Sequence, residues 1–359
     1  MLSTCDHGSP GFRALRSISY KYVVILVSAL LAGAAMFGQS VGSGTLVASA
    51  DVDTPQRGFA LPTWQVDGYD GLGIGQSMSE MKELGANWVQ LTPTWWQLDR
   101  YTSDIIRAVG TVSDTGLERA IKLAHQHGLK VFLKPHVDLP HNLRDSRNNI
   151  RPHDRGAWFN SYTAFITHYA EMAQQLGVEQ FAVATELTGV TDDRTAWLNI
   201  IQAVRDRYAG PLVYAAGDNW LNVPFWDAVD VIGVDAYLQL GTAPTTDVQA
   251  LKRAWESVLG DAVALSAQYG KQILFTEAGY TSQRGTITDP SNWRVSRTPD
   301  QAEQAAAYEA LLATFTGQPW WAGVYWWLWA DAPDVEADPL DFSPRGKAAE
   351  AVIRRWWAG

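Results

Sequence analysis

Residues 272–280 read QILFTEAGY, a short apolar run with a single carboxylate, Glu277, near its end. Near-continuous apolar runs of this length are typical of strands buried on both faces, as in a parallel sheet covered by helices. Seven other segments have a similar length and character. The eight predicted strands are residues 59–64, 87–92, 130–138, 180–187, 211–217, 231–240, 272–280 and 322–329.

Amphipathic helix patterns lie between most of these strands. In one of them Leu117, Ile121 and Ala124 recur at helical spacing, with Asp114 before them and Gly128 after them as start and stop signals. The seven predicted helices are residues 79–84, 117–127, 158–176, 196–208, 248–269, 301–315 and 346–357.

Strands that alternate with helices predict an α/β protein, and eight strands favour a single (β/α)8 TIM barrel over residues 51–359. An open doubly wound sheet is the alternative, but such a sheet more often carries a Gly-rich phosphate turn after its first strand. The one Gly-rich cluster, residues 71–75, lacks the spacing of that motif, and we interpret it as a plain turn.

Residues 1–50 have the pattern of a secretory signal peptide, or of an N-terminal membrane anchor. Basic residues precede an uncharged stretch over residues 23–38, and the segment ends in the small-residue sequence ASA. The remaining chain is therefore expected to be secreted or extracytoplasmic, with membrane contact only if this segment is not cleaved. Cys5 is the only cysteine, so the exported domain is expected to have no disulfide and no cysteine metal ligand.

The composition excludes several classes of protein. Of 359 residues, 47% are hydrophobic and 18% are charged, which is not the composition of a disordered polymer. Lys and Arg number 28 against 38 Asp and Glu, a net charge of -10, so nucleic acid is not an expected partner. We expect a monomer without cofactor or metal that acts on a neutral substrate, which needs no electrostatic steering.

Two predicted strands end in a glutamate, which is costly to bury unless it is paired or used. Glu186 ends the fourth strand and Glu277 ends the seventh. Because side chains alternate along a strand, Glu186 is predicted to share a face with Ala182 and Ala184. Glu277 is likewise predicted to share a face with Ile273 and Phe275. If both faces point inward, the two carboxylates meet at the C-terminal mouth of the barrel, where the active sites of this fold lie.

Paired carboxylates across a cleft suit the cleavage of a glycosidic bond. One carboxyl group donates a proton to the leaving oxygen, and the other attacks the anomeric carbon or activates water. The alternative is that each glutamate forms an ordinary ion pair with an arginine or a lysine at the end of its strand.

Further polar residues are predicted near the same mouth. Lys134, His136 and Asp138 alternate with apolar residues on the third strand, so they are expected to share one face. His136 and Asp138 could ligate a metal, but binding of sugar hydroxyls or support of a catalytic carboxylate is favoured. Asp235 and Tyr237 share a face of the sixth strand, where the Tyr237 hydroxyl could keep a nucleophilic carboxylate ionised or could simply be a core group.

The chain contains 17 tryptophans, more than a core needs, and some of them fall at predicted strand ends. Flat aromatic rings match the apolar faces of sugars, so we expect rim tryptophans to form the walls of a sugar site. Other tryptophans, such as Trp197 and Trp255, are expected to pack in the core. The candidate sugar-binding tryptophans are Trp95, Trp96, Trp220, Trp327 and Trp329.

Several segments, in this order and spacing, resemble glycoside hydrolase family 113. They are residues 133–138 (LKPHVD), 184–187 (ATEL), 214–220 (YAAGDNW), 225–227 (FWD), 233–237 (GVDAY) and 275–280 (FTEAGY). The resemblance covers most of residues 59–331. It implies a (β/α)8 enzyme that degrades β-mannan, from a clan with its acid/base on strand four and its nucleophile on strand seven.

The resemblance also implies roles for individual residues. Glu186 is the expected acid/base and Glu277 the expected nucleophile of a retaining mechanism, with Tyr237 orienting the nucleophile. His136 and Asn219 are expected to bind near the reacting sugar. A strand-eight tryptophan is expected to form the floor of that subsite, with Trp327 favoured over Trp329.

The sequence departs from the family pattern at a few positions. Thr185 precedes the acid/base, as the family allows, whereas most of the wider clan has Asn there. Ala184 and the pair Leu238-Gln239 replace a Gly and an aromatic-Pro pair. The alternative hypotheses are a hydrolase of the same mechanism acting on xylan or β-glucan, an exo-acting enzyme on short oligosaccharides, and a non-catalytic carbohydrate-binding barrel. Residues 139–156 are expected to form the rim that decides the substrate.

Overall fold

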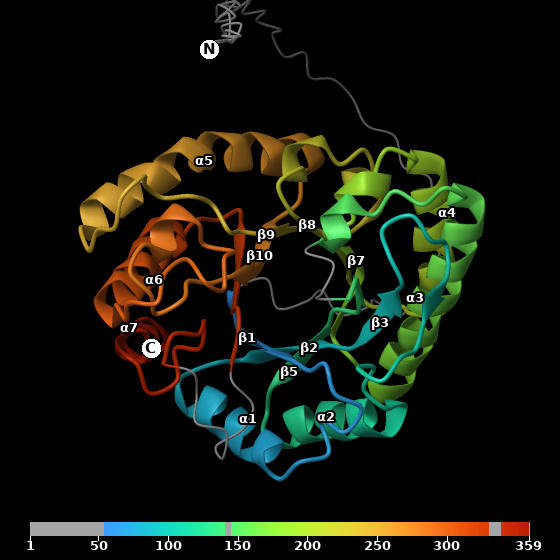
Figure 1. Cartoon of the computed structure of the whole chain (residues 1–359), viewed down its shortest axis with the longest axis horizontal. Coiled ribbons are helices and arrows are strands. Elements are labelled where there is room, and N and C mark those ends of the chain that lie inside the picture. The colour runs from blue at the N-terminus through green and yellow to red at the C-terminus, as the bar shows by residue number, and fades with distance from the viewer. Residues whose placement is uncertain (1–53, 141–144, 330–338, 359) are drawn as a thin grey trace, which may run out of the picture. The chain divides into compact units, whose positions relative to one another are not determined.

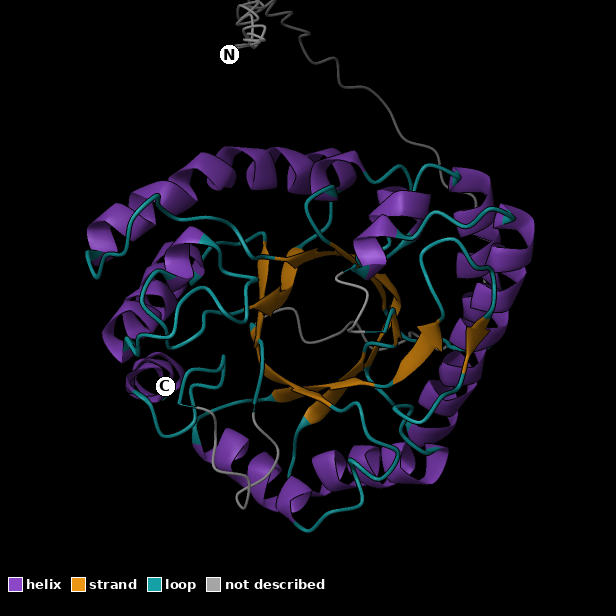
Figure 2. Ribbon diagram, viewed as in Figure 1, coloured by secondary structure: helices purple, strands orange, loops and turns teal. Residues whose placement is uncertain are grey.

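Eight parallel strands close into a barrel in the computed structural model of this chain, which describes residues 54–140, 145–329 and 339–358 (Figure 2). The predicted TIM barrel is confirmed. In spatial order the strands are β1 (Gln56–Pro62), β11 (Trp321–Trp326), β10 (Ile273–Ala278), β9 (Val231–Asp235), β8 (Leu212–Ala216), β7 (Gln180–Thr185), β5 (Lys130–Leu133) and β2 (Trp88–Thr92), which pairs with β1.

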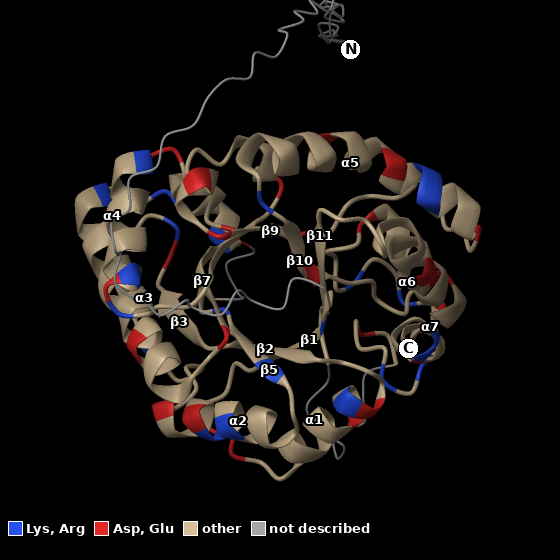
Figure 3. Cartoon of the chain, turned by 180° about the vertical axis from the view of Figure 1, so that it is seen from behind, with Lys and Arg blue, Asp and Glu red and all other residues tan. Residues whose placement is uncertain are grey.

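Seven α-helices surround the ring of strands in the described part of the chain (Figure 1). They are α1 (Gly73–Glu83), α2 (Asp114–Gln126), α3 (Arg155–Leu176), α4 (Arg194–Arg205), α5 (Val248–Tyr269), α6 (Gln301–Phe315) and α7 (Ala348–Trp357). No long helix links β8 to β9, where the chain instead forms the short 3-10 helices η4 (Trp220–Asn222) and η5 (Trp226–Ala228). Most charged residues belong to helices and connecting loops (Figure 3).

The predicted signal or anchor segment, residues 1–50, lies outside the described residues. Within the described ranges, none of the helices has the length and apolar character needed to cross a membrane.

The inside of the barrel is filled by one small apolar cluster. Its members come from β2, β5, β7, β8, β10 and β11, and residues from strands all around a closed ring can meet only inside it. Gly58 on β1 makes room for this cluster, because a Cβ there would lie 2.3 Å from the Tyr325 ring. The cluster is Trp88, Phe132, Ala182, Val213, Leu274, Ala322 and Tyr325.

Much of the tryptophan content packs between the strands and the helices. Trp197 on α4 stacks on Phe225 with ring centroids 5.3 Å apart, and Trp255 on α5 packs on Phe275 and Phe315. Aromatic pairs of this kind add stability beyond their buried area. The fully buried tryptophans are Trp158, Trp197, Trp226, Trp255, Trp326 and Trp329. Only part of the tryptophan excess is therefore available to a ligand.

The Gly-rich cluster at residues 71–75 is not the plain turn that we predicted. Gly73 begins α1, six residues before the predicted start at Ser79. Ile74, Ser77, Met78 and Met81 form the buried face of this helix, at helical spacing. The glycines hid this pattern because glycine is unfavourable in helices.

The predicted third strand, residues 130–138, is divided in two. β5 ends at Leu133, and Pro135, which has no N–H to donate, interrupts the ladder. The second part, β6 (His136–Asp138), pairs with β3 (Thr94–Gln97), which in turn pairs with β4 (Ile105–Ile106). This small second sheet was not predicted. The sixth strand is also shorter than predicted and ends at Asp235 rather than Leu240.

The predicted face shared by Phe275 and Glu277 on β10 is wrong. Phe275 packs against Trp255 of α5 and Phe315 of α6, on the outside of the barrel. The register between β10 and β9 shifts between Phe275 and Glu277, as in a β-bulge. This irregularity lets Glu277 face the barrel mouth although Phe275 faces the helices.

The close approach of β1 and β11 at Gly323 leads us to predict that a larger residue there destabilises the protein. Its φ is 134°, and a Cβ would lie 2.0 Å from the Gln56 carbonyl oxygen on the paired strand. We expect Gly323→Ala to lower the free energy of unfolding by about 3 kcal/mol, because the two strands must move apart. Gly317 is the matched control, since its φ is 86° but nothing lies within 4 Å.

Urea unfolding of both variants tests this prediction. Gly317→Ala should cost only about 1 kcal/mol, the penalty of a left-handed residue alone. Equal losses in the two variants would mean that the close approach of the two strands contributes nothing.

Candidate active site

A cavity of about 920 Å³ opens at the C-terminal ends of the barrel strands. Both strand-end glutamates line it: Glu186 follows β7, and Glu277 is the last residue but one of β10. Tyr237, which follows β9, and Trp327, which follows β11, also line it. The topology thus brings together side chains that lie far apart in the sequence, at the end of the barrel where the chemistry of this fold occurs.

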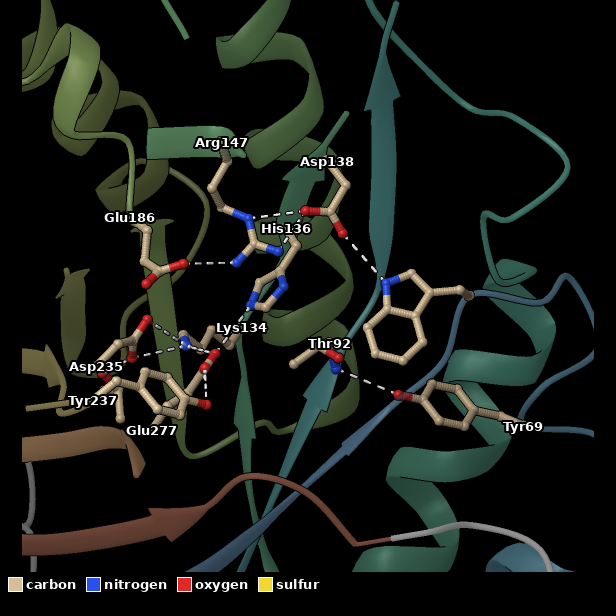
Figure 4. A network of polar contacts seen from close by, with 12 residues as sticks. Tyr69, Thr92, Lys134, His136, Asp138, Arg147, Glu186, Asp235, Tyr237 and Glu277 are labelled. Atoms are coloured by element: carbon tan, nitrogen blue, oxygen red, sulfur yellow. Dashed lines mark hydrogen bonds and ion pairs between the residues drawn. The ribbon is translucent and has the colours of Figure 1, made fainter. Parts of the chain in front are cut away.

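Glu277 is held from two sides. The Tyr237 hydroxyl donates a hydrogen bond to Glu277 Oε2 at 2.9 Å, and Lys134 Nζ lies 2.5 Å from Oε1 (Figure 4). The Glu277 side chain is only 4% exposed, so these donors replace nearly all of its water. A fixed carboxylate with its oxygens held in place is suited to attack a carbon at one defined position.

Lys134 joins two carboxylates under the cavity. Its Nζ lies 3.1 Å from both oxygens of Asp235, in addition to the contact with Glu277, and its side chain is fully buried. Thr276 Oγ1 also donates to Asp235, at 2.6 Å. Burial raises the pKa of Asp235 above its ordinary value, and the Lys134 ammonium opposes this shift. When all three groups are ionised, the two carboxylates and the one ammonium have a net charge of minus one.

His136 lies beside Glu277 as a neutral ring. Its Nε2 is 3.8 Å from Glu277 Oε1, but burial lowers the pKa of His136 well below the ordinary value, so the contact is not an ion pair. Neither ring nitrogen has a hydrogen-bond partner among the described residues. The ring stacks on Trp327 with an interplanar angle of 16°. A sugar hydroxyl could satisfy a nitrogen that the protein leaves unpaired.

Glu186 adopts a backbone conformation that is rare for a non-glycine residue. Its φ is 53°, while its N–H still donates to the Ala215 carbonyl at 2.8 Å. Left-handed backbone of this kind is costly and is found mainly at functional sites. Here it ends the β7 ladder after Thr185 and aims the Glu186 side chain into the cavity.

Arg147 connects Glu186 to Asp138 (Figure 4). Arg147 Nη1 lies 3.1 Å from Glu186 Oε2, and Nε donates to Asp138 Oδ1 at 2.9 Å. The other Asp138 oxygen accepts from the indole N–H of Trp64 at 3.3 Å. Asp138 is thus committed to Arg147 and Trp64, and no group of three His, Cys, Asp or Glu side chains suited to a metal occurs in the described ranges.

Burial raises the pKa of both glutamates above the ordinary value. For Glu186 the charge of Glu277 adds to the shift and Arg147 opposes it. For Glu277 the neighbouring Asp235 adds to the shift, and Lys134 opposes it. Burial therefore raises the pKa of both glutamates and does not show which one is the acid/base and which the nucleophile. The two differ in their donors: Glu277 accepts from an ammonium and a hydroxyl, which both favour its ionised form, whereas Glu186 accepts, among the described residues, only from the Arg147 guanidinium.

Tyr237→Phe tests the support of Glu277. A hydrogen bond to a charged group is worth about 1.5–3 kcal/mol, so we expect kcat/KM to fall about tenfold or more. Loss of the donor also raises the pKa of Glu277, so the acid limb of the pH profile should move to higher pH. Steady-state kinetics across pH measure both effects. A profile with an unchanged acid limb would show that the hydroxyl does not act on Glu277.

Arg147→Met tests the contact with Glu186. Removal of this cation raises the pKa of Glu186, and the alkaline limb of kcat/KM should move up by about one pH unit. The matched control is Arg100→Met. This variant removes the 3.4 Å ion pair between Arg100 and Asp145, which lies two residues before Arg147, and leaves Glu186 untouched. The prediction fails if both variants keep the wild-type alkaline limb.

The predicted sugar-binding tryptophans differ in whether they line the cavity. Trp327 lines the cavity, whereas Trp329 is 1% exposed and packs on Phe59. Trp95 and Trp96 lie in β3 and do not line the cavity. Trp95 donates to the Tyr169 hydroxyl of α3 at 2.9 Å. A role in sugar stacking thus has geometric support only for Trp327 among these four.

Asn219 and Trp220 follow β8 but do not line the cavity either. The Asn219 amide oxygen accepts from Thr188 and its nitrogen donates to Thr191, both at 3.1 Å. The Trp220 side chain is buried, and its carbonyl accepts from the Trp226 indole at 2.8 Å. In this arrangement Asn219 positions the loop after Glu186, and its predicted contact with sugar has no support from the geometry.

Several cavity residues were not predicted, among them two tryptophans and an arginine. Trp64 ends the first predicted strand and lies two residues after β1, so the rule that identified the other strand-end residues could have found it. Arg147 lies in the 139–156 segment, and its contact with Glu186 depends on how that loop folds back. Trp293 belongs to the long connection after β10, where the sequence shows no periodic pattern.

Comparisons with known proteins found a matching family and similar solved structures. The model of Glycoside Hydrolase Family 113 matches residues 63–342. A β-mannanase of that family from Alicyclobacillus acidocaldarius is 29% identical, with a TM-score of 0.77 over 86% of this chain and 99% of that one. A family 113 β-1,4-mannanase is 27% identical, with a TM-score of 0.76 over 84% and 98%.

More distant structures share the fold alone. A family 5 mannosidase from Rhizomucor miehei is 10% identical, with a TM-score of 0.58 over 85% of this chain and 92% of that one. A search of the curated proteins gave no match.

Proposed function

Because this chain belongs to glycoside hydrolase family 113, and is therefore a glycoside hydrolase, we propose that it cleaves β-1,4-mannosidic bonds in mannan-type polysaccharides by a retaining double displacement. The observation that carries this proposal is the pair of glutamates in one cavity, Glu277 buried and Glu186 partly exposed, each held by different donors. A protein that only binds carbohydrate has no need of two such groups.

In the first step Glu277 attacks the anomeric carbon while Glu186 protonates the leaving oxygen. Glu277 suits the nucleophile because Lys134 and Tyr237 favour its ionised form. Glu186 suits the acid because burial and the charge of Glu277 both raise its pKa. In the second step Glu186, now ionised, takes a proton from water, which attacks the glycosyl-enzyme from the face that the leaving group has vacated.

Arg147 adds a requirement to this scheme. Its ion pair with Glu186 favours the ionised form, which suits the second step and opposes the first. Asp138 shares the charge of Arg147 and reduces this effect. Proton donation therefore requires that Arg147 turn towards Asp138 when the sugar enters, or that the incoming substrate raise the pKa of Glu186 further by excluding water.

The aromatic residues support a sugar ring at the centre of the cavity. Trp327 lies against His136 and Trp64, with the Trp64 and Trp327 ring centroids 6.2 Å apart. The choice of mannan rests on the solved family members, which are described as β-mannanases.

We also propose that the enzyme is a monomer and that residues 1–50 direct its export. Mass spectrometry of the protein recovered from culture medium tests where that segment is cut.

Product analysis with defined manno-, xylo- and gluco-oligosaccharides tests the substrate and the mode together. We expect cleavage of internal β-1,4 bonds in manno-oligosaccharides and much slower cleavage of the other two. Proton NMR during the first turnovers tests the stereochemistry, since a retaining enzyme releases the β-anomer first. Release of the α-anomer would require an inverting mechanism, and preference for xylo- or gluco-oligosaccharides would reassign the substrate.

A further inference from the structure

The connection after β10, residues 281–299, forms one side of the cavity and carries two arginines. Trp293, Arg294 and Arg297 all line the cavity and are exposed to solvent. Neither arginine side chain has an ion-pair or hydrogen-bond partner in the described ranges. Most other described arginines are paired: those at 100, 107, 147, 155, 194, 205, 207, 345, 354 and 355 each contact a carboxylate.

Hydrogen bonds hold this connection in place against the rest of the protein. Gln283 is buried, and its amide nitrogen donates to the carbonyls of Trp293 and Leu340 at 2.8 and 2.9 Å. Its amide oxygen accepts from the Ser296 N–H at 3.0 Å. The Glu303 carboxylate also accepts from the backbone N–H of Gly285 at 2.8 Å. The two arginines are therefore presented from a backbone that is held in place.

An aromatic surface lies next to these charges. Trp293 is 46% exposed, and its ring forms a T-shaped contact with Phe342, with centroids 4.8 Å apart. An exposed indole on a fastened loop can stack on a sugar, and a guanidinium beside it can form two parallel hydrogen bonds to a carboxylate. Unpaired cations at the cavity rim stand out in a chain with a net charge of -10.

We propose that Trp293, Arg294 and Arg297 form a subsite for a sugar that carries a carboxylate, so that the preferred glycan is an acidic, uronate-bearing one rather than a fully neutral mannan. This inference rests on the proposed function, because it assumes that the glycan chain runs through the cavity that holds Glu186 and Glu277. It replaces the expectation of a neutral substrate, which came from the net charge of the whole chain.

The test compares two forms of one substrate. β-1,4-Mannan is oxidised sparsely at C6 to the uronate, and part of the sample is then converted to the methyl ester, which has the same shape without the charge. We expect the wild-type KM to be about fivefold lower for the carboxylate than for the ester, the size of one or two exposed ion pairs. The ratio should approach one at high salt, because salt screens exposed charges.

The variant Arg294→Gln/Arg297→Gln should lose the difference between the two substrates. Arg253→Gln is the matched control, since Arg253 is an exposed arginine on α5 outside the cavity, and this variant should keep the wild-type ratio. Equal KM values for carboxylate and ester in the wild-type enzyme would overturn the inference.

The failure of this inference differs from the failure of the proposed function. If unmodified mannan is cleaved but carboxylate and ester behave alike, the mannanase proposal stands and the acidic subsite does not. If unmodified mannan and both modified forms resist cleavage, the substrate proposal itself has failed.

Discussion

Replacement of Glu277 by alanine is expected to lower kcat on mannan by about 10⁵-fold, a loss typical of a missing covalent nucleophile. The truncated side chain leaves space at the anomeric carbon, so added azide should restore part of the activity. Azide would attack from the side that Glu277 occupied, with a single inversion, and the product should be the α-mannosyl azide. Lys134 keeps Asp235 as its partner, so the fold should persist.

Kinetics with and without azide, and NMR of the azide product, measure this prediction. Glu309→Ala is a matched control, because Glu309 on α6 pairs with Arg355 far from the cavity lining. It should retain near wild-type activity. A Glu277→Ala enzyme that keeps wild-type turnover would remove Glu277 from the role of nucleophile.

Replacement of Glu186 by alanine is expected to lower kcat on mannan by about 10³-fold, the usual contribution of a general acid and base. The loss should be much smaller for aryl mannosides with acidic leaving groups, because such groups depart without protonation. The alkaline limb of the pH profile should disappear together with the group that titrates. Azide should accelerate the second step and give the β-mannosyl azide, since it attacks the glycosyl-enzyme after one inversion.

The two azide products form a joint test. The α-product from Glu277→Ala and the β-product from Glu186→Ala assign one role to each residue. The opposite pair of products would exchange the roles. Absence of rescue in both variants, with intact folding by circular dichroism, would contradict a covalent intermediate on either glutamate.

The fold could be predicted because each strand is a local apolar run. Glu186 and Glu277 could be identified because a carboxylate at the end of such a run is unusual. The third-strand residue Lys134 was also identified, although its strand proved to end one residue earlier. These predictions needed only residue type and position along a strand, together with the rule that the strands of a barrel share one functional end.

Other features could not be predicted because they depend on contacts between distant segments. The bulge before Glu277 arises from the pairing of β10 with β9 and is not encoded by alternation. Trp95 was expected at the rim, but pairing of β3 with β6 turns its ring towards α3. Arg147 reaches Glu186 from a short 3-10 helix, Arg147–Asn149, whose position against the end of β7 depends on the folded chain.

The shared ammonium of Lys134 has a consequence for the catalytic cycle. On the proposed route Glu277 loses its negative charge when it forms an ester with the sugar, yet Asp235 remains 3.1 Å from Lys134 Nζ. With Asp235 ionised, the covalent state therefore contains one buried cation and one buried anion, a neutral pair, whereas a resting state with both carboxylates ionised carries an excess negative charge. Because burial of unbalanced charge is costly, Asp235 lowers the electrostatic penalty of the ester state. The Asp235 carboxylate remains the ion-pair partner of Lys134 while Glu277 forms the ester and is then released from it.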